Sequence, residues 1–458
     1  MVFHVTNPTT GTREKTFDSH TPEEVERRIA LAQAAHEHLR HQTTFGDRAA
    51  LMNRAADLME AEVDELAVML VREMGKPIAQ AEAEVLKCVK SMRFYAAKAE
   101  EFLADEPADA GAVGASRAYV AYNPLGVVLA VMPWNYPLWQ VMRFAAPALM
   151  AGNAGLLKHA SNVPESALYL DALFTRAGFP EGAFGALMIE AKDVAAVIDD
   201  WRVKAVTLTG SEPAGRSVAE NAGRNIKKTV LELGGSDAFV VMPSADIDKA
   251  VATGVLARVN NNGQSCIAGK RFIVHADVYD LFVDKFTAAM GALVVGDPME
   301  RETQIGPLAT ENGVRDLEEF VADARAKGAR VLVGGDRLDR PGFFFPPTVI
   351  DQITPEMRLF AEEAFGPLAS VYRAESFDHA IELANDSLFG LSSAIWTNDD
   401  TEQQQAMMRL DAGAVFVNGM TISYPELPFG GIKNSGYGRE LAAPGIREFT
   451  NMKTIWKA

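Results

Sequence analysis

Cys266 is the residue of this chain whose surroundings best suit a nucleophile. It ends a polar run, residues 261–266, that contains a glycine and no apolar stripe. A buried structural cysteine prefers apolar neighbours, so we expect this thiol to border a cleft and to attack an electrophilic carbon as thiolate. The other cysteine, Cys88, shares a predicted helix with Val85 and Met92 at helical spacing, which predicts an inert core position.

A thiol nucleophile needs a base, and no histidine of this chain is well placed for that role. His275 follows Cys266 in a predicted strand. Glu232 is the better candidate, because it ends a predicted strand and the glycines after it, Gly234 and Gly235, leave room for a ligand beside the backbone. The histidines near the N-terminus form one cluster, which we interpret as a solvated helix face and not as a metal site: His36, His38 and His41.

A turn that could bind phosphate follows the predicted strand over residues 205–209. The three-glycine dinucleotide fingerprint and the Walker A loop are both absent from the sequence. Gly210 and Ser211 nevertheless end this strand as a helix opens, and such a turn exposes amide hydrogens to a pyrophosphate. An ordinary helix start explains the same residues, so both interpretations stand.

The elements that must position these residues follow two patterns. The first hundred residues look helical, with a capping box at Thr21 and helices predicted towards His41, over residues 47–74 and on to about residue 103. Beyond residue 127, short apolar runs alternate with helical stretches, which predicts an α/β fold of two doubly wound domains. The predicted strands are residues 127–132, 155–158, 184–189, 205–209 and 238–242, then 272–275, 331–333, 369–372, 391–396 and 414–417.

Length and charge exclude several classes of protein. A chain of 458 residues is long enough for about three structural units, and 44 basic against 61 acidic residues give a net charge of −17. Such a surface repels phosphate backbones and anionic headgroups, so we expect neither a nucleic-acid nor a membrane partner. Two cysteines form no disulfide framework, and residues 1–13 do not resemble a signal peptide, so we expect a cytoplasmic protein.

Five separated motifs resemble those of the aldehyde dehydrogenase superfamily, in the same order and at similar spacing over nearly the whole chain. Among its members, the resemblance is greatest to the bacterial NADP-preferring succinate-semialdehyde dehydrogenases. The motifs are Pro133-Trp134-Asn135, Glu232-Leu233-Gly234-Gly235, Gly263-Gln264-Ser265-Cys266, Glu363-Ala364-Phe365-Gly366-Pro367 and Pro428-Phe429-Gly430-Gly431.

The resemblance implies a role for each matching residue. Cys266 would attack the aldehyde carbon, the Asn135 amide and the Cys266 backbone N–H would stabilise the oxyanion, and Glu232 would activate the water that hydrolyses the thioester. Glu363 would hold the nicotinamide-side ribose with Phe365 beside it. The remaining residues of the implied cofactor path are Trp134, Gly210, Ser211 and Leu233.

One departure from the family pattern bears on the cofactor. NAD-preferring relatives typically read Lys-Pro-Ser-Glu after the strand that follows the Asn135 helix, where this chain reads Lys158-His159-Ala160-Ser161. Loss of that carboxylate beside a retained lysine favours a 2′-phosphate, so we predict NADP over NAD.

The substrate prediction depends on Arg143. Tyr136, Trp139, Gln140 and Arg143 follow Asn135 at helical spacing. The resemblance makes Arg143 a ligand of the substrate carboxylate, with Ser423 as a second candidate, and the most fitting substrate is succinate semialdehyde. The alternatives are a structural salt bridge at Arg143 in a broader aliphatic or aromatic aldehyde dehydrogenase, and a cysteine-dependent thioesterase or acyl transferase without hydride transfer.

The resemblance also divides the chain. Residues 1–113 and 132–234 would form the cofactor-binding domain, and residues 235–434 the catalytic domain that carries the nucleophile. Residues 114–131 and 446–458 would form an oligomerisation element, in which the segment near residues 117–126 and the tail pair across a subunit interface. We therefore predict a homodimer or homotetramer.

Overall fold

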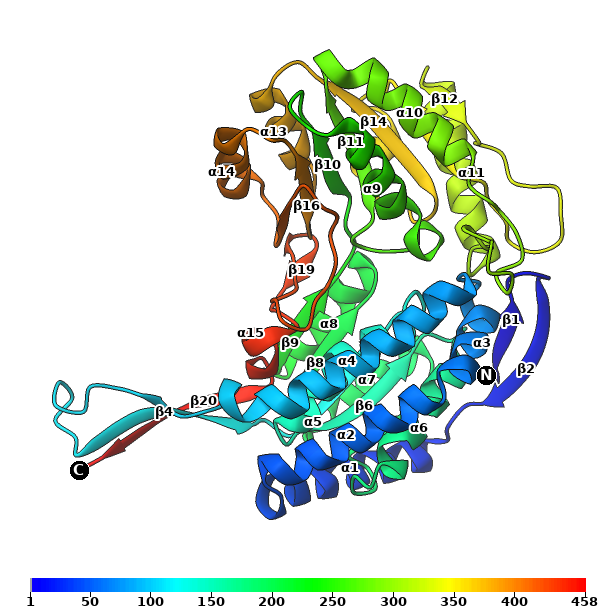
Figure 1. Cartoon of the computed structure of the whole chain (residues 1–458). Coiled ribbons are helices and arrows are strands. Elements are labelled where there is room, and N and C mark those ends of the chain that lie inside the picture. The colour runs from blue at the N-terminus through cyan, green and yellow to red at the C-terminus, as the bar shows by residue number, and fades with distance from the viewer. Residues whose placement is uncertain (1) are drawn as a thin grey trace.

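The computed structural model describes residues 2–458 and contains two α/β domains and a projecting β-ribbon (Figure 1). Met1, the first residue of the predicted cofactor-binding domain, lies outside the described residues. The predicted α/β class with two doubly wound domains is confirmed, because each domain is built on a mainly parallel sheet with crossover helices.

The first domain is built on a six-stranded sheet of order β19-β9-β8-β5-β6-β7, in which only β19 is antiparallel. The chain runs from β5 outward through β6 to β7 and then returns to β8 on the other side of β5. Ligands of such sheets bind beyond the carboxyl ends of the strands at this reversal. The strands are β5 (Val127–Met132), β6 (Ala154–His159), β7 (Phe184–Ala186), β8 (Val203–Thr209), β9 (Lys228–Glu232) and β19 (Gly436–Tyr437).

The helices of the first domain begin and end much as the sequence predicts. Thr21 accepts a hydrogen bond from the Glu24 N–H, and Gly75 ends a helix at a φ of 76°. The region predicted as one helix over residues 47–74 is two helices, because the chain leaves helical geometry at Glu62. The helices are α1 (Pro22–Gln42), α2 (Phe45–Ala61), α3 (Val63–Met74), α4 (Ile78–Phe102), α5 (Trp139–Met150), α6 (Pro164–Arg176), α7 (Val194–Asp199) and α8 (Glu212–Arg224).

The prediction that the first hundred residues are helical is wrong at the start. An antiparallel hairpin of β1 (Val2–Asn7) and β2 (Thr12–Asp18) precedes α1. Phe3 and Val5 alternate with more exposed residues and are buried, which is the two-residue period of a strand.

The second domain has a seven-stranded sheet of order β12-β13-β14-β11-β10-β16-β17, parallel except for the β12–β13 pair. Its strands are β10 (Asp237–Val241), β11 (Gly269–His275), β12 (Arg330–Val333), β13 (Thr348–Asp351), β14 (Leu368–Ala374), β16 (Ser393–Trp396) and β17 (Val415–Val417). Its helices are α9 (Ile247–Val259), α10 (Tyr279–Gly291), α11 (Glu311–Ala326), α12 (Arg358–Ala361), α13 (Phe377–Asn385) and α14 (Asp400–Arg409). β15 (Phe389–Gly390) pairs separately with β18 (Ile432–Lys433), and α15 (Ala442–Arg447) lies beyond them in the chain.

The ribbon corrects one boundary of the predicted oligomerisation element. Its strands β3 (Glu106–Pro107), β4 (Arg117–Pro124) and β20 (Thr450–Lys457) form a three-stranded antiparallel sheet, in which β4 pairs with β20 of the same chain. The predicted element over residues 114–131 is too long, because β5 belongs to the six-stranded sheet.

No helix of the described chain combines the length and the apolar character that a membrane crossing requires.

Candidate active site

The loop that carries Cys266 is held in an uncommon backbone conformation. Asn261 and Asn262 have φ values of 59° and 56°, in the left-handed region that L-residues rarely adopt. The Asn262 side chain donates to the carbonyls of Gly75 and Pro307 at 2.9 and 2.8 Å and accepts from the Gly306 N–H. These bonds offset the backbone strain, which is typical of functional loops.

Two glycines bring this loop against the motif at residues 363–367. Gly263 has a φ of 72°, and a Cβ built on it would lie 2.4 Å from the Gly366 carbonyl oxygen. The buried Arg258 donates to the carbonyls of both glycines and so fastens the two motifs together.

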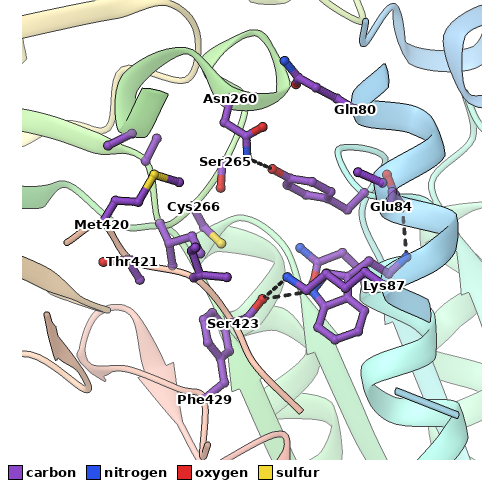
Figure 2. Close-up of a pocket in the computed structure, with 18 of the residues that line it drawn as sticks. Gln80, Glu84, Lys87, Asn260, Ser265, Cys266, Met420, Thr421, Ser423 and Phe429 are labelled. Carbon is purple, nitrogen blue, oxygen red and sulfur yellow. Dashed lines mark hydrogen bonds between the residues drawn. The ribbon is translucent and has the colours of Figure 1, made fainter. Parts of the chain in front are cut away.

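The Cys266 thiol borders a cavity of about 260 Å³ between the two domains (Figure 2). Burial raises the pKa of Cys266 to about 11, against the opposing effect of the nearby Arg143 and Lys270 cations. This volume is just below the range for small-molecule sites, roughly 300–1,000 Å³, which suits a small substrate.

Asn135 lies beside the nucleophile loop. Its side-chain amide donates to the Gln264 carbonyl at 3.1 Å, and its backbone carbonyl accepts from Asn261. The Cys266 backbone N–H has no acceptor within residues 2–458. An amide group and a free N–H beside a thiol form a donor pair suited to an oxyanion.

Glu232 ends β9 as a buried carboxylate that is 2% exposed. Neither of its oxygens has a hydrogen-bond partner among the described residues. Burial, with the nearby Glu440 carboxylate, raises its pKa well above the usual range, and Arg143 opposes that shift. Gly430 makes room for this carboxylate, because a Cβ there would lie 2.6 Å from Glu232 Oε1.

Arg143 lines the Cys266 cavity from α5, together with Trp139 and Gln140. Its guanidinium is buried, and Nε lies 2.8 Å from Glu440 Oε2. The structural ion pair that the sequence left open as an alternative is therefore present, at a position that also faces the cavity.

Ser423 lines the same cavity beside Trp139 and Lys87. Its hydroxyl oxygen accepts from Trp139 Nε1 at 3.1 Å and from Lys87 Nζ at 2.8 Å (Figure 2).

Sequence reasoning missed the contribution of α4 to this cavity. Gln80, Glu84 and Lys87 lie three and four residues apart, on one helix face, and all three line it. The sequence did contain a signal for this face, because these three polar residues recur at helical spacing among apolar residues. Glu440 was also missed, and only its folded position next to Arg143 marks it.

A second cavity, of about 730 Å³, lies on the other side of the nucleophile loop, where Gln264 is part of its wall. The Trp134 and Phe365 rings meet edge to face there at 5.7 Å. Lys158 has no ion pair within residues 2–458, and burial lowers its pKa. Six of the predicted cofactor residues line this cleft: Trp134, Lys158, Ala160, Ser161, Glu363 and Phe365.

His159 does not face the cleft, contrary to the prediction. Its ring is buried and lies 2.9 Å from the Pro137 carbonyl and 3.3 Å from the Met132 carbonyl. Burial lowers its pKa to about 4. The alternation of side chains along β6 turns His159 inward while Lys158 turns outward.

The remaining predicted cofactor residues lie around the start of α8. Gly210 donates its N–H to the Glu232 carbonyl, and Ser211 precedes α8 without a side-chain cap bond. Leu233 packs so closely on Gly215 that a Cβ there would lie 2.6 Å from it. Glu363 Oε1 lies 2.9 Å from Lys270 Nζ, which also donates to the Cys266 carbonyl.

Comparison with known proteins agrees with this geometry. The model of the aldehyde dehydrogenase family matches residues 1–455. A succinate-semialdehyde dehydrogenase [NADP(+)] of Mycobacterium avium is 61% identical over 98% of this chain and 95% of its own, and its Mycobacterium ulcerans counterpart is 60% identical over 100% of both. The crystal structure of succinic semialdehyde dehydrogenase from Streptococcus pyogenes in complex with NADP+ superimposes with a TM-score of 0.96, at 37% identity over 99% of both chains. The family match covers nearly all residues of this chain, and the cysteine loop lies within it. The chain belongs to the aldehyde dehydrogenase family.

Proposed function

We propose that this protein oxidises succinate semialdehyde to succinate with NADP. The observation that carries the proposal is the position of the Cys266 loop, which separates a small cavity walled by Lys87 and Arg143 from a cleft that holds the unpaired Lys158. The names of the mycobacterial relatives, which cover nearly the whole chain, support the same substrate and cofactor.

The chain's own residues account for the covalent steps. Cys266 Sγ, as thiolate, forms a bond to the aldehyde carbon, and the Asn135 amide and Cys266 N–H stabilise the oxyanion. Departure of hydride from that carbon leaves a thioester. Glu232 then takes a proton from water, the water oxygen bonds to the thioester carbon, and the C–S bond breaks to release the acid and the thiolate. Its raised pKa makes Glu232 a stronger base once it is ionised.

Bound NADP supplies the acceptor for that hydride. The residues present fit the cofactor, because Lys158 is a cation without an acidic partner among residues 2–458 and no carboxylate occupies positions 158–161. Lys158 and Ser161 would hold the 2′-phosphate, and Glu363 the nicotinamide-side ribose.

An assay across a panel of aldehydes with both cofactors tests the proposal. Absorbance of reduced nicotinamide should grow fastest with succinate semialdehyde and NADP. Equal catalytic efficiency with NAD would contradict the cofactor assignment. Comparable rates with uncharged aliphatic or aromatic aldehydes would favour a broad-specificity enzyme, and no signal with any aldehyde would favour a thioesterase or acyl transferase.

We also propose that the protein is a cytosolic homodimer or homotetramer. Both cysteines are free, which fits a reducing compartment. The ribbon of β3, β4 and β20 projects from the body (Figure 1) and exposes Met452 and Trp456. A three-stranded ribbon with apolar side chains in solvent is a natural subunit contact.

A further inference from the structure

Lys87 is part of the wall of the Cys266 cavity. No sequence motif pointed to this residue. It lies on α4 one turn beyond Glu84, and the cavity reaches from this helix to the nucleophile (Figure 2). Its ammonium lies 4.3 Å from the centre of the Trp139 ring and donates to Ser423 at 2.8 Å. The cation is therefore held in a fixed place against the cavity wall.

The carboxylate of Glu84, the nearest to Lys87 along the helix, already has partners for both of its oxygens. Glu84 Oε1 accepts from the N–H groups of Leu138 and Trp139, at 2.9 and 3.0 Å, and its other oxygen pairs with the buried Lys76. No ion pair involves Lys87 within residues 2–458. A largely desolvated ammonium without a carboxylate gains strongly from an anionic ligand.

The second cation of the cavity shares its charge with a carboxylate, although Arg143 Nη2 has no hydrogen-bond partner among the described residues. Arg143 Nε lies 2.8 Å from Glu440 Oε2, and both side chains are buried. An arriving carboxylate would therefore meet Arg143 in competition with Glu440, whereas Lys87 offers an unshared charge.

Ser423 completes the geometry of an anion site. A hydroxyl has one donor hydrogen and two acceptor lone pairs. Both acceptor positions of Ser423 are used by Lys87 Nζ and Trp139 Nε1, so its own hydrogen is left to donate to a ligand.

We propose that Lys87, oriented by Ser423 and Trp139, binds the carboxylate of the substrate and determines the preference for aldehydes that carry one. This inference rests on the proposed function and names the residue that selects the substrate. One carboxylate oxygen accepts from the ammonium and the other from the Ser423 hydroxyl, while the aldehyde end faces Cys266.

The test compares Lys87→Met with a matched control, Lys90→Met, on the same helix. Lys90 pairs with Glu426 at the surface and lies outside the cavity. Lys87→Met should raise the KM for succinate semialdehyde at least about tenfold, the scale of a lost charge-assisted bond, and that for butanal much less. Lys90→Met should leave both KM values at their wild-type level, and Lys87→Arg should keep part of the preference.

The outcomes separate this inference from the proposed function. A wild-type enzyme that does not prefer succinate semialdehyde to butanal would overturn both. A preference that survives in Lys87→Met would overturn the assignment of Lys87 alone. If Lys87→Met fails to fold, Ser423→Ala supplies the test, because loss of the hydroxyl should weaken binding of succinate, measured by calorimetry, several-fold. Unchanged succinate affinity in Ser423→Ala would then overturn the assignment.

Discussion

Arg143 and Glu440 form a buried ion pair next to the candidate base Glu232. Removing one partner of such a pair leaves an uncompensated charge in the interior. Arg143→Ala should therefore lower the free energy of unfolding by about 3–5 kcal/mol, measured by urea denaturation. The double variant Arg143→Met/Glu440→Gln should recover part of that loss.

The same substitution should also affect the chemistry. Without Arg143 the pKa of Glu232 should rise further, because the cation that opposes its shift is gone. A variant that is as stable as wild type and loses only affinity for succinate semialdehyde would show that Arg143 acts purely as a substrate ligand.

The charge of Lys87 should appear in the pH dependence of substrate preference. Burial and Arg143 lower its pKa to about 8, while Cys88, Glu84 and Cys266 act in the opposite direction. The ammonium is charged below that pH and neutral above it. The ratio of kcat/KM for succinate semialdehyde to that for butanal should thus fall as the pH rises through about 8.

This ratio isolates Lys87 from the nucleophile, because both aldehydes require the same Cys266 thiolate and its titration cancels. Lys87→Met supplies the control, since its ratio should be low and flat across the same pH range. A wild-type ratio that stays constant between pH 7 and pH 9 would contradict the assignment.

At the scale of single residues, the sequence pointed to Cys266 and Glu232 through the glycine-containing turns beside them, and to Asn135 through its motif. Lys87 and Glu440 could not be predicted in this way. They come from distant segments, and their roles depend on which charges remain unpaired after folding.

The carboxyl end of β6 is the element where the cofactor preference can be tested. Ser161 lines the cleft close to Lys158. Ser161→Glu would place a carboxylate where a 2′-phosphate is expected, so it should lower kcat/KM for NADP at least about tenfold and that for NAD much less. Steady-state kinetics with each cofactor measures both effects.

Two comparisons make that experiment decisive. Ser161→Gln adds a similar volume without the charge and should have a smaller effect on NADP. If Ser161→Glu and Ser161→Gln impair NADP equally, shape and not charge governs this position.

Among elements, the central strands were predictable because they are short apolar runs buried on both faces, as β5 and β10 are. The hairpin β1–β2 and strand β13 were not. β2 is largely exposed and its sequence is mostly polar. β13 is short and follows a long irregular segment. Neither strand has the continuous apolar run that marks a buried strand.

At the scale of the whole molecule, the ribbon should decide assembly. Met452 and Trp456 lie four residues apart on one face of β20 and are 68% and 53% exposed. A double substitution of both residues by aspartate should convert a dimer or tetramer to monomers in sedimentation velocity, since buried charges oppose association.

Met408 provides the control for this experiment, because it is 85% exposed on α14, away from the ribbon. Met408→Asp should leave the sedimentation coefficient unchanged. A wild-type protein that sediments as a monomer at working concentration would contradict the proposed assembly.

The chain crosses between the two sheets twice, first from β9 to β10 and later from β17 back to β19, which pairs with β9. Two segments of the chain therefore connect the sheets. Each crossing also carries site residues, Glu232 at the end of β9 and Ser423 in the return segment. An insertion in either connection should therefore displace Glu232 or Ser423, so the candidate site depends on the length of both connections.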